Sequence, residues 1–256
     1  MLPLVPDPAQ PADDTTAAAA APAADAAAPT VAGAGRSGPT PRPTPADDLA
    51  AALRLFTDHA TIRLLLVETA ALVATRPLLG RLRRRDVAVA AGVIAGWPFL
   101  EWTAHKLVLH AKPRSVAGHR IDPAVARYHR AHHADPWDLD LTLLPMWFLV
   151  PTGPLLAAAW RVAARDTRTA VSGMAATAAA TVVYEWTHFL THTGYRPKGS
   201  WYRRLQRRHR LHHFKDEHLW YGFTVPFVDD LFRTAPDPTT VPTSPTVRTL
   251  GVTDEA

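Results

Sequence analysis

Four stretches of the chain are apolar enough to form membrane-associated helices, and polar segments separate them. The first, residues 49–75, carries interrupting charges, so an interfacial helix fits it as well as a spanning helix does. The second runs from Val87 to Leu100, about 21 Å of helix, and approaches a spanning length if it continues to residue 104. The third, residues 141–160, contains three prolines, and the fourth, residues 170–189, is rich in small residues that favour close helix packing.

Polar segments at both ends of the chain flank a single predicted domain. Residues 1–48 contain ten prolines and almost no large apolar side chain, and residues 235–256 have a similar composition. We expect both ends to be disordered, because they bury too little apolar surface to offset the entropy of ordering. Asp47 or Asp48 is positioned to cap a helix that begins at Leu49. Residues 49–234 are therefore predicted to be an all-α integral membrane bundle of three to four membrane helices, with a histidine-rich helical cap.

Charge and composition limit the kinds of partner and the kinds of chemistry that fit this chain. The net charge of the chain is +5. Residues 1–48 have a net charge of −4, so the net charge of the remaining residues is +9. The arginines flank apolar segments and no nucleic-acid motif is present, so the basic balance favours a membrane surface over nucleic acid. The absence of cysteine excludes disulfides, thiolate ligands and cysteine catalysis.

The distribution of basic residues also predicts an orientation. Two crossings by the third and fourth stretches return the chain to one surface, and eight lysines and arginines lie between Arg196 and Lys215 on that surface. The positive-inside rule makes this side cytoplasmic, although four arginines in residues 81–85 then lie on the opposite side. Because the Ala- and Arg-rich composition is typical of GC-rich bacteria, we expect a bacterial cytoplasmic membrane.

Histidine is the most informative residue type in the chain. Ten of the thirteen histidines form four clusters beside the apolar stretches: His105 and His110; His129, His132 and His133; His188 and His192; and His209, His212 and His213. Within each of the last three clusters, the spacings of three and four residues place the imidazoles on one helix face. His105 and His110 are five residues apart and converge only if the helix contains a π-bulge or ends between them. Clustered imidazoles near a bilayer predict a metal site.

The clusters form two similar halves. Glu101-Trp-Thr-Ala-His105 resembles Glu185-Trp-Thr-His188, and each is followed by a second histidine and later by His-x-x-His-His. This repetition predicts two metal ions in a pseudo-symmetric site. Glu101 and Glu185 each precede a histidine on the same helix face. We expect each carboxylate to orient an imidazole by accepting a hydrogen bond from the ring nitrogen that does not bind the metal. Ten histidines exceed the needs of one zinc ion and suit two irons, which with O2 attack unactivated C–H bonds.

The histidine series resembles the fatty acid hydroxylase/sterol desaturase superfamily of membrane diiron oxygenases over residues 60–234. Residues 184–192, Gly222-Phe223 and residues 229–232 look most like the fatty acid 2-hydroxylase branch. The resemblance implies two iron ions, with zinc as a substitute in purified protein, and O2 as co-substrate. It assigns the ligand role to His105, His110, His129, His132, His133, His188, His192, His209, His212 and His213.

The same resemblance implies hydroxylation of a lipid, first a fatty-acyl chain. A carotenoid or sterol-like substrate, or desaturation by loss of a second hydrogen, is the alternative at the same site. Nothing in residues 1–48 has the haem histidines of a fused cytochrome b5 domain. Electrons are therefore expected from a separate ferredoxin- or cytochrome-type donor. A metal-binding membrane protein without turnover is the non-enzymatic alternative.

Overall fold

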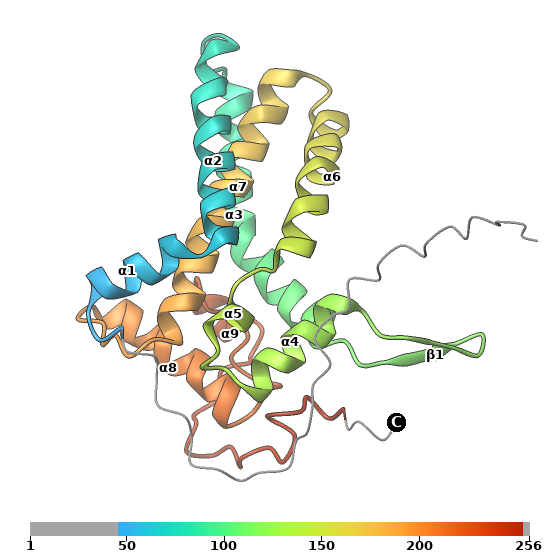
Figure 1. The fold of residues 1–256 in the computed structure, drawn as a ribbon, viewed down its shortest axis with the longest axis vertical. Helices are drawn as coiled ribbons and strands as arrows, with labels where there is room; N and C mark the ends of the chain where they lie inside the picture. Colours follow the sequence, from blue (N-terminus) through green and yellow to red (C-terminus); the bar gives the residue numbers. More distant parts are fainter. Residues whose placement is uncertain (1–45, 253–256) are drawn as a thin grey trace, which may run out of the picture.

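The computed structural model describes residues 46–252, and the expectation for residues 1–45 lies outside them. Four long helices stand side by side, and the shorter helices form a cap at one end of this bundle (Figure 1). The bundle consists of α2 (Ala60–Leu78), α3 (Arg84–Ala104), α6 (Met146–Ala164) and α7 (Thr167–Thr191). The helices of the cap are α4 (Ala124–Ala134), α5 (Leu139–Thr142), α8 (Ser200–Phe214) and α9 (Phe227–Leu231).

The central helix of the bundle is α7, which packs against α2, α3 and α6. Asp166 caps its start, because the side chain accepts a hydrogen bond from the Thr169 amide at 3.1 Å. The small residues expected to allow close packing do so at Gly173. A Cβ at this position would lie 2.5 Å from the Trp160 ring of α6, so only glycine fits the contact.

Two segments of the described chain are long and apolar enough to cross a membrane, Arg84–Leu109 and Leu139–Ala164. In the most apolar 18 residues of each segment, only 11% and 17% of the residues are buried within the protein, so most of these side chains face outward. Leu155 and Val162, for example, are 71% and 77% exposed. The outer surface of the bundle therefore suits lipid. Neither α2 nor α7 is among these segments, and the three to four membrane helices expected from the sequence stay a prediction.

The predicted helix from residue 49 to residue 75 is divided into α1 (Leu49–Asp58) and α2. The backbone becomes extended at His59 (φ −70°, ψ 131°), and α1 turns across the end of the bundle (Figure 1). Asp48 provides the expected cap, accepting from the Ala51 amide at 2.7 Å. The turn buries Phe56 against Phe189 and Trp186 of α7, a contact that one straight helix would not make.

The end of the bundle opposite the cap is held by a buried ion-pair network. Arg76 donates to Asp86 at 2.6 Å and to the Ser172 hydroxyl at 2.7 Å, and Asp86 also accepts from Arg83 and Thr169. Arg83 reaches Asp166 at 2.6 Å as well. Arg83, one of the basic residues in the segment that conflicts with the predicted orientation, therefore has carboxylate partners that join α2, α3 and α7.

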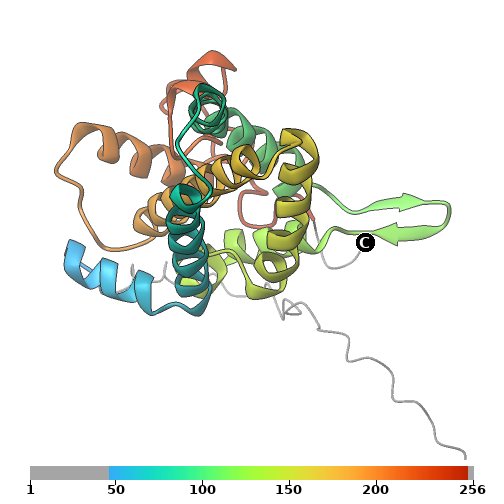
Figure 2. The ribbon, with the colours of Figure 1, turned by 90° about the horizontal axis from the view of Figure 1, so that it is seen from above.

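Two segments differ from the sequence-based expectation. Strands β1 (Arg114–Val116) and β2 (His119–Ile121) form an unexpected antiparallel hairpin that projects sideways from the cap (Figure 2). Residues 235–252, for which composition favours disorder, instead form turns against the cap. Burial of Val247 and Leu250, 7% and 3% exposed, anchors the second segment.

Candidate metal centre

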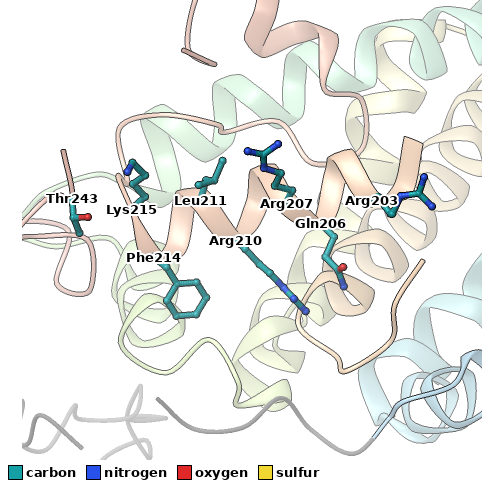
Figure 3. A pocket seen from close by; sticks show the side chains of 8 residues that line it. All are labelled: Arg203, Gln206, Arg207, Arg210, Leu211, Phe214, Lys215 and Thr243. Carbon is teal, nitrogen blue, oxygen red and sulfur yellow. The ribbon is translucent and has the colours of Figure 1, made fainter. Parts of the chain in front are cut away.

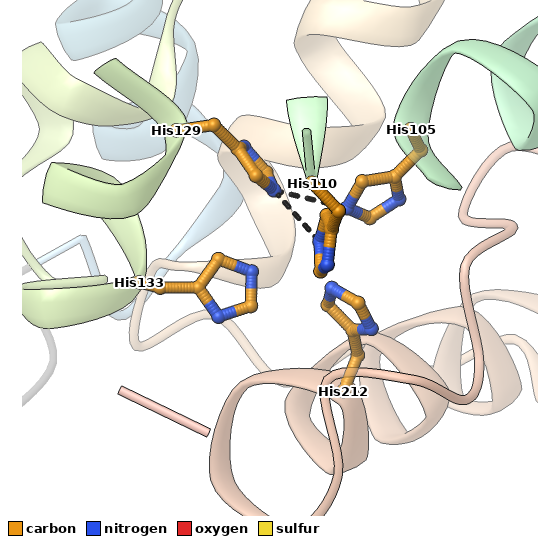
Figure 4. A group of neighbouring side chains, drawn as sticks. All are labelled: His105, His110, His129, His133 and His212. Atoms are coloured by element: carbon orange, nitrogen blue, oxygen red, sulfur yellow. Dashed lines mark hydrogen bonds between the residues drawn. The ribbon is translucent and has the colours of Figure 1, made fainter. Parts of the chain in front are cut away.

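The ten clustered histidines converge in the cap as two groups of five. Within each group the ligand nitrogens lie within 4.8 Å of one another. The first group, of which Figure 4 shows all five side chains, consists of His105, His110, His129, His133 and His212. The second consists of His132, His188, His192, His209 and His213. The remaining histidines, His59, His119 and His218, belong to neither group.

Each group contains one histidine from the His-x-x-His-His motif that contributes mainly to the other group, an arrangement that we term the exchange. In His129-x-x-His132-His133, the first and last imidazoles belong to the first group and His132 belongs to the second. In the motif on α8 the arrangement is reversed, because His212 belongs to the first group. Each His-x-x-His-His motif therefore contributes to both groups, where the sequence suggests one shared face per helix. Both α4 and α8 therefore take part in both groups.

The pair His105 and His110 converges through a change in helix type. Residues His105–Leu109 form the π-helix η1 directly after α3, and the His110 amide donates to the His105 carbonyl at 3.2 Å. Because a π-turn contains more residues than an α-turn, positions i and i+5 come into alignment. Of the two arrangements that the spacing allows, the structure has the π-bulge. Both imidazoles approach the Nε2 atom of His129, at 3.1 and 3.2 Å (Figure 4).

The distances between ring nitrogens match those of ligands around a metal ion. In the second group, His192 Nε2 lies 3.3 Å from His188 Nε2 and 2.8 Å from His209 Nε2. Nitrogens bound at about 2.0–2.1 Å to one ion are separated by about 2.8–3.4 Å in octahedral or tetrahedral geometry. A set of neutral imidazoles cannot satisfy all these contacts as hydrogen bonds, because each ring has one N–H.

Backbone carbonyls orient three imidazoles of the first group. The Nδ1 atoms of His105, His212 and His133 lie 2.7, 2.7 and 3.1 Å from the carbonyl oxygens of Tyr221, Leu219 and Val247, respectively. Nδ1 is then the protonated nitrogen that donates, and Nε2 presents a lone pair.

Several buried ring nitrogens lack a hydrogen-bond partner. They include Nε2 of His133, Nε2 of His212 and both ring nitrogens of His132. Buried polar atoms are normally paired, so unpaired nitrogens in each of the two histidine groups fit bound metal ions.

Burial keeps the imidazoles of the cap neutral. Loss of solvation lowers the pKa of His133 to about 3, and the neighbouring His105 adds to this effect. The pKa values of His129, His132, His212 and His213 are also well below the usual range, again mainly because of burial. Neutral imidazole is the form that binds metal, so the site is ready for a cation without prior deprotonation.

The two glutamates do not contact the histidines as the sequence suggests. Glu101 accepts from the amides of Phe223 and Thr224 at 2.7 and 3.0 Å, and Glu185 accepts from the Leu144 amide at 3.0 Å. They hold loops rather than imidazoles. The orienting role belongs instead to backbone carbonyls.

The loop that Glu101 holds places an aromatic side chain between the two groups. Phe223 is 1% exposed, and its ring lies 4.8 Å from that of His188 and 5.7 Å from that of His105, measured between centroids. Tyr184 packs on Phe223 at 4.7 Å, and Trp97 packs on Tyr184 at 6.3 Å. These rings form an apolar line from the bundle to the histidines. Tyr184 and Phe223 lie in the two family-like stretches 184–192 and Gly222-Phe223, but the sequence does not show that their rings are in contact.

Comparisons with known proteins match the part of the chain that contains the ten clustered histidines. The fatty acid hydroxylase family model matches residues 90–234. Dihydroceramide fatty acyl 2-hydroxylase FAH2 of Arabidopsis thaliana is 31% identical over 149 residues, 58% of this chain and 60% of that protein. Fatty acid 2-hydroxylase of Mus musculus is 27% identical over 140 residues, 54% of this chain and 37% of that protein.

One solved structure has the same fold. It is full-length Scs7p, of which only the hydroxylase domain is visible, with a TM-score of 0.57 and 21% sequence identity. The match covers 72% of this chain and 68% of that chain. The likeness to this structure concerns the fold.

Proposed function

Because this chain belongs to the fatty acid hydroxylase family, we propose that it is a membrane oxidoreductase that hydroxylates a fatty-acyl chain at a diiron site. The observation that carries the proposal is the pair of five-histidine groups with unpaired, convergent nitrogens. Two bound irons would supply O2 activation and hydrogen abstraction from an unactivated C–H bond. The named relatives are 2-hydroxylases of fatty acids and dihydroceramide fatty acyl groups, which supports an acyl substrate over a carotenoid or sterol.

The chain's own residues would bind and shield the acyl chain. The aromatic line of Trp97, Tyr184 and Phe223 leads from the apolar bundle to the histidines, so an acyl chain would approach from the lipid side. Phe223 contacts histidines of both groups and would limit water at the reacting carbon. Glu101 would hold Phe223 in this position through the two loop amides.

Lipid analysis tests the proposed activity. Expression of the chain in a host of defined lipid composition should add one oxygen atom, a mass increase of about 16 Da, to fatty-acyl chains. Purified protein should contain about two irons per chain. Mass spectrometry of total fatty acids and metal analysis measure the two quantities, and the untransformed host is the control. Fully loaded iron with an unchanged lipid profile would instead favour a metal-binding protein without turnover.

A basic groove on α8 fits the separate electron donor. Figure 3 shows this groove, of about 700 Å³, on the cap. Among the described residues, its lining includes four cations and no carboxylate: Arg203, Gln206, Arg207, Arg210, Leu211, Phe214, Lys215 and Thr243. The same helix carries three of the clustered histidines, all fully buried. Because α8 lies at the end of the molecule away from the apolar bundle (Figure 1), an acidic soluble donor suits the groove better than lipid.

Charge reversal tests this docking surface. The double variant Arg207→Glu with Lys215→Glu should reduce hydroxylation driven by an acidic reduced [2Fe–2S] ferredoxin by about tenfold or more, because it replaces attraction by repulsion. Hydroxylation driven by dithionite should be unchanged. The matched control is Arg114→Glu with Arg120→Glu on the projecting hairpin, which alters the net charge equally. Equal losses in both double variants would show that only overall charge matters.

A further inference from the structure

The segment after residue 234 makes specific contacts with the cap, although the family model ends there. Residues 244–250, which we term the C-terminal strap, connect the ends of α4 and α8. The Ser244 amide donates to the Lys215 carbonyl at 2.7 Å, and the Thr246 hydroxyl donates to the Glu217 carboxylate. Arg248 donates to the Ala134 carbonyl at 2.5 Å. The two joined helix ends are those that carry the His-x-x-His-His motifs.

The strap also contacts a histidine of the first group directly. The Val247 carbonyl lies 3.1 Å from Nδ1 of His133, and no other hydrogen-bond partner is recorded for that ring among the described residues. Val247 is 7% exposed, so water does not compete strongly for the bond. The second ring nitrogen of His133, Nε2, is buried and unpaired in the first group. The carbonyl thus decides which nitrogen carries the proton and where the lone pair points.

The anchors of the strap lie on both sides of this carbonyl. Thr246 precedes it and bonds Glu217, which is 1% exposed, and Arg248 follows it and packs 5.5 Å over the Phe214 ring. The Leu250 amide closes a turn on the Thr246 carbonyl at 2.7 Å. With a fixed residue on each side, the Val247 carbonyl has little freedom to move away from His133.

We propose that the C-terminal strap is a positioning segment of the metal centre, which holds His133 so that the first histidine group retains its ion. This inference rests on metal binding by the two groups as proposed above. No corresponding strap contact is recorded for the second group within residues 46–252, so release of the strap should affect the two ions unequally. The imidazole of His133 would remain present but would be free to rotate.

Metal release from the full-length chain tests the strap. The double variant Thr246→Val with Arg248→Ala removes an anchor on each side of the carbonyl. Iron-loaded protein in detergent is mixed with a chelator, and release is followed together with the Mössbauer signals of the two irons. One iron should leave about 10–100-fold faster than in the unmodified chain, the effect typical of losing an outer partner of a ligand, while the other is unchanged.

Two further variants separate positioning from general stability. Glu217→Ala removes the Thr246 anchor from the opposite side and should give the same selective release. The control, Thr239→Val, removes a hydroxyl from an exposed turn of the same C-terminal segment and should have no effect. Within residues 46–252 this hydroxyl bonds only Asp237. Unchanged release in both strap variants would overturn the proposal. Equal acceleration for both irons, with a lower unfolding temperature, would overturn it as well, because that result indicates a purely structural role.

Failure of the strap proposal can be distinguished from failure of the proposed hydroxylase activity. A chain that binds two irons, releases one selectively in the strap variants and leaves lipids unchanged would support the strap and contradict the hydroxylase. A chain that hydroxylates lipid but shows no selective iron release in the strap variants would support the hydroxylase and contradict the strap. An unmodified chain that binds no metal would contradict both.

Discussion

His212→Ala should remove the metal ion from the first histidine group, although His212 lies in the last histidine motif of the chain. His132→Ala should remove the ion from the second group, although it lies in the second of the four clusters. The reason is the exchange between the groups, since each of these imidazoles projects into the group formed mainly by the other half of the sequence. Lipid hydroxylation should fall to the background level in both variants, because the proposed chemistry needs both ions.

The two variants should be distinguishable by spectroscopy. Each should lose a different one of the two iron signals, and the loss in affinity should exceed the about 10–100-fold typical of an outer partner, because a ligand itself is removed. Metal analysis and Mössbauer spectroscopy of iron-loaded protein measure the effect. His59→Ala is the matched control, because His59 belongs to neither group. Loss of the same iron in both variants would contradict the exchange.

Asp86→Ala should cause the largest loss of stability among single changes remote from the metal centre. Asp86 is 0% exposed and accepts hydrogen bonds from Arg76, Arg83 and Thr169. Its removal leaves Arg76, which is 6% exposed, without its carboxylate partner in the described structure. The expected cost is about 3 kcal/mol, the lower end of the range for breaking a buried pair, because the network lies at the end of the bundle.

Unfolding of the purified chain in detergent measures this cost. The control is Arg85→Ala, which removes a more exposed partner of Asp166 at 3.5 Å and should change the unfolding midpoint little. Metal content of the folded Asp86→Ala fraction should remain unchanged, because the network and the histidines lie at opposite ends of the bundle (Figure 1). Equal midpoint shifts for the two variants would show that the buried pair contributes no more than a surface pair.

The helical architecture and the residues of the metal centre are largely readable from the sequence for local reasons. Apolar stretches of sufficient length predict helices, and spacings of three and four residues place imidazoles on one face. Even the π-helix at His105 follows from the five-residue spacing, once both imidazoles are assigned to one site. The break at His59 was not predictable in this way, because it depends on packing of Phe56 against the distant α7.

Residue type and periodicity are properties of the chain, and they are enough to predict that ten histidines meet beside an apolar helical bundle. Which imidazoles share a group depends on the tertiary fold, because the rotation and crossing of α4 and α8 set the side-chain directions. It also assigned the orienting role to carbonyls of Leu219, Tyr221 and Val247 rather than to glutamates. Every residue has a backbone carbonyl, so no pattern of side chains marks the few that the fold brings to an imidazole.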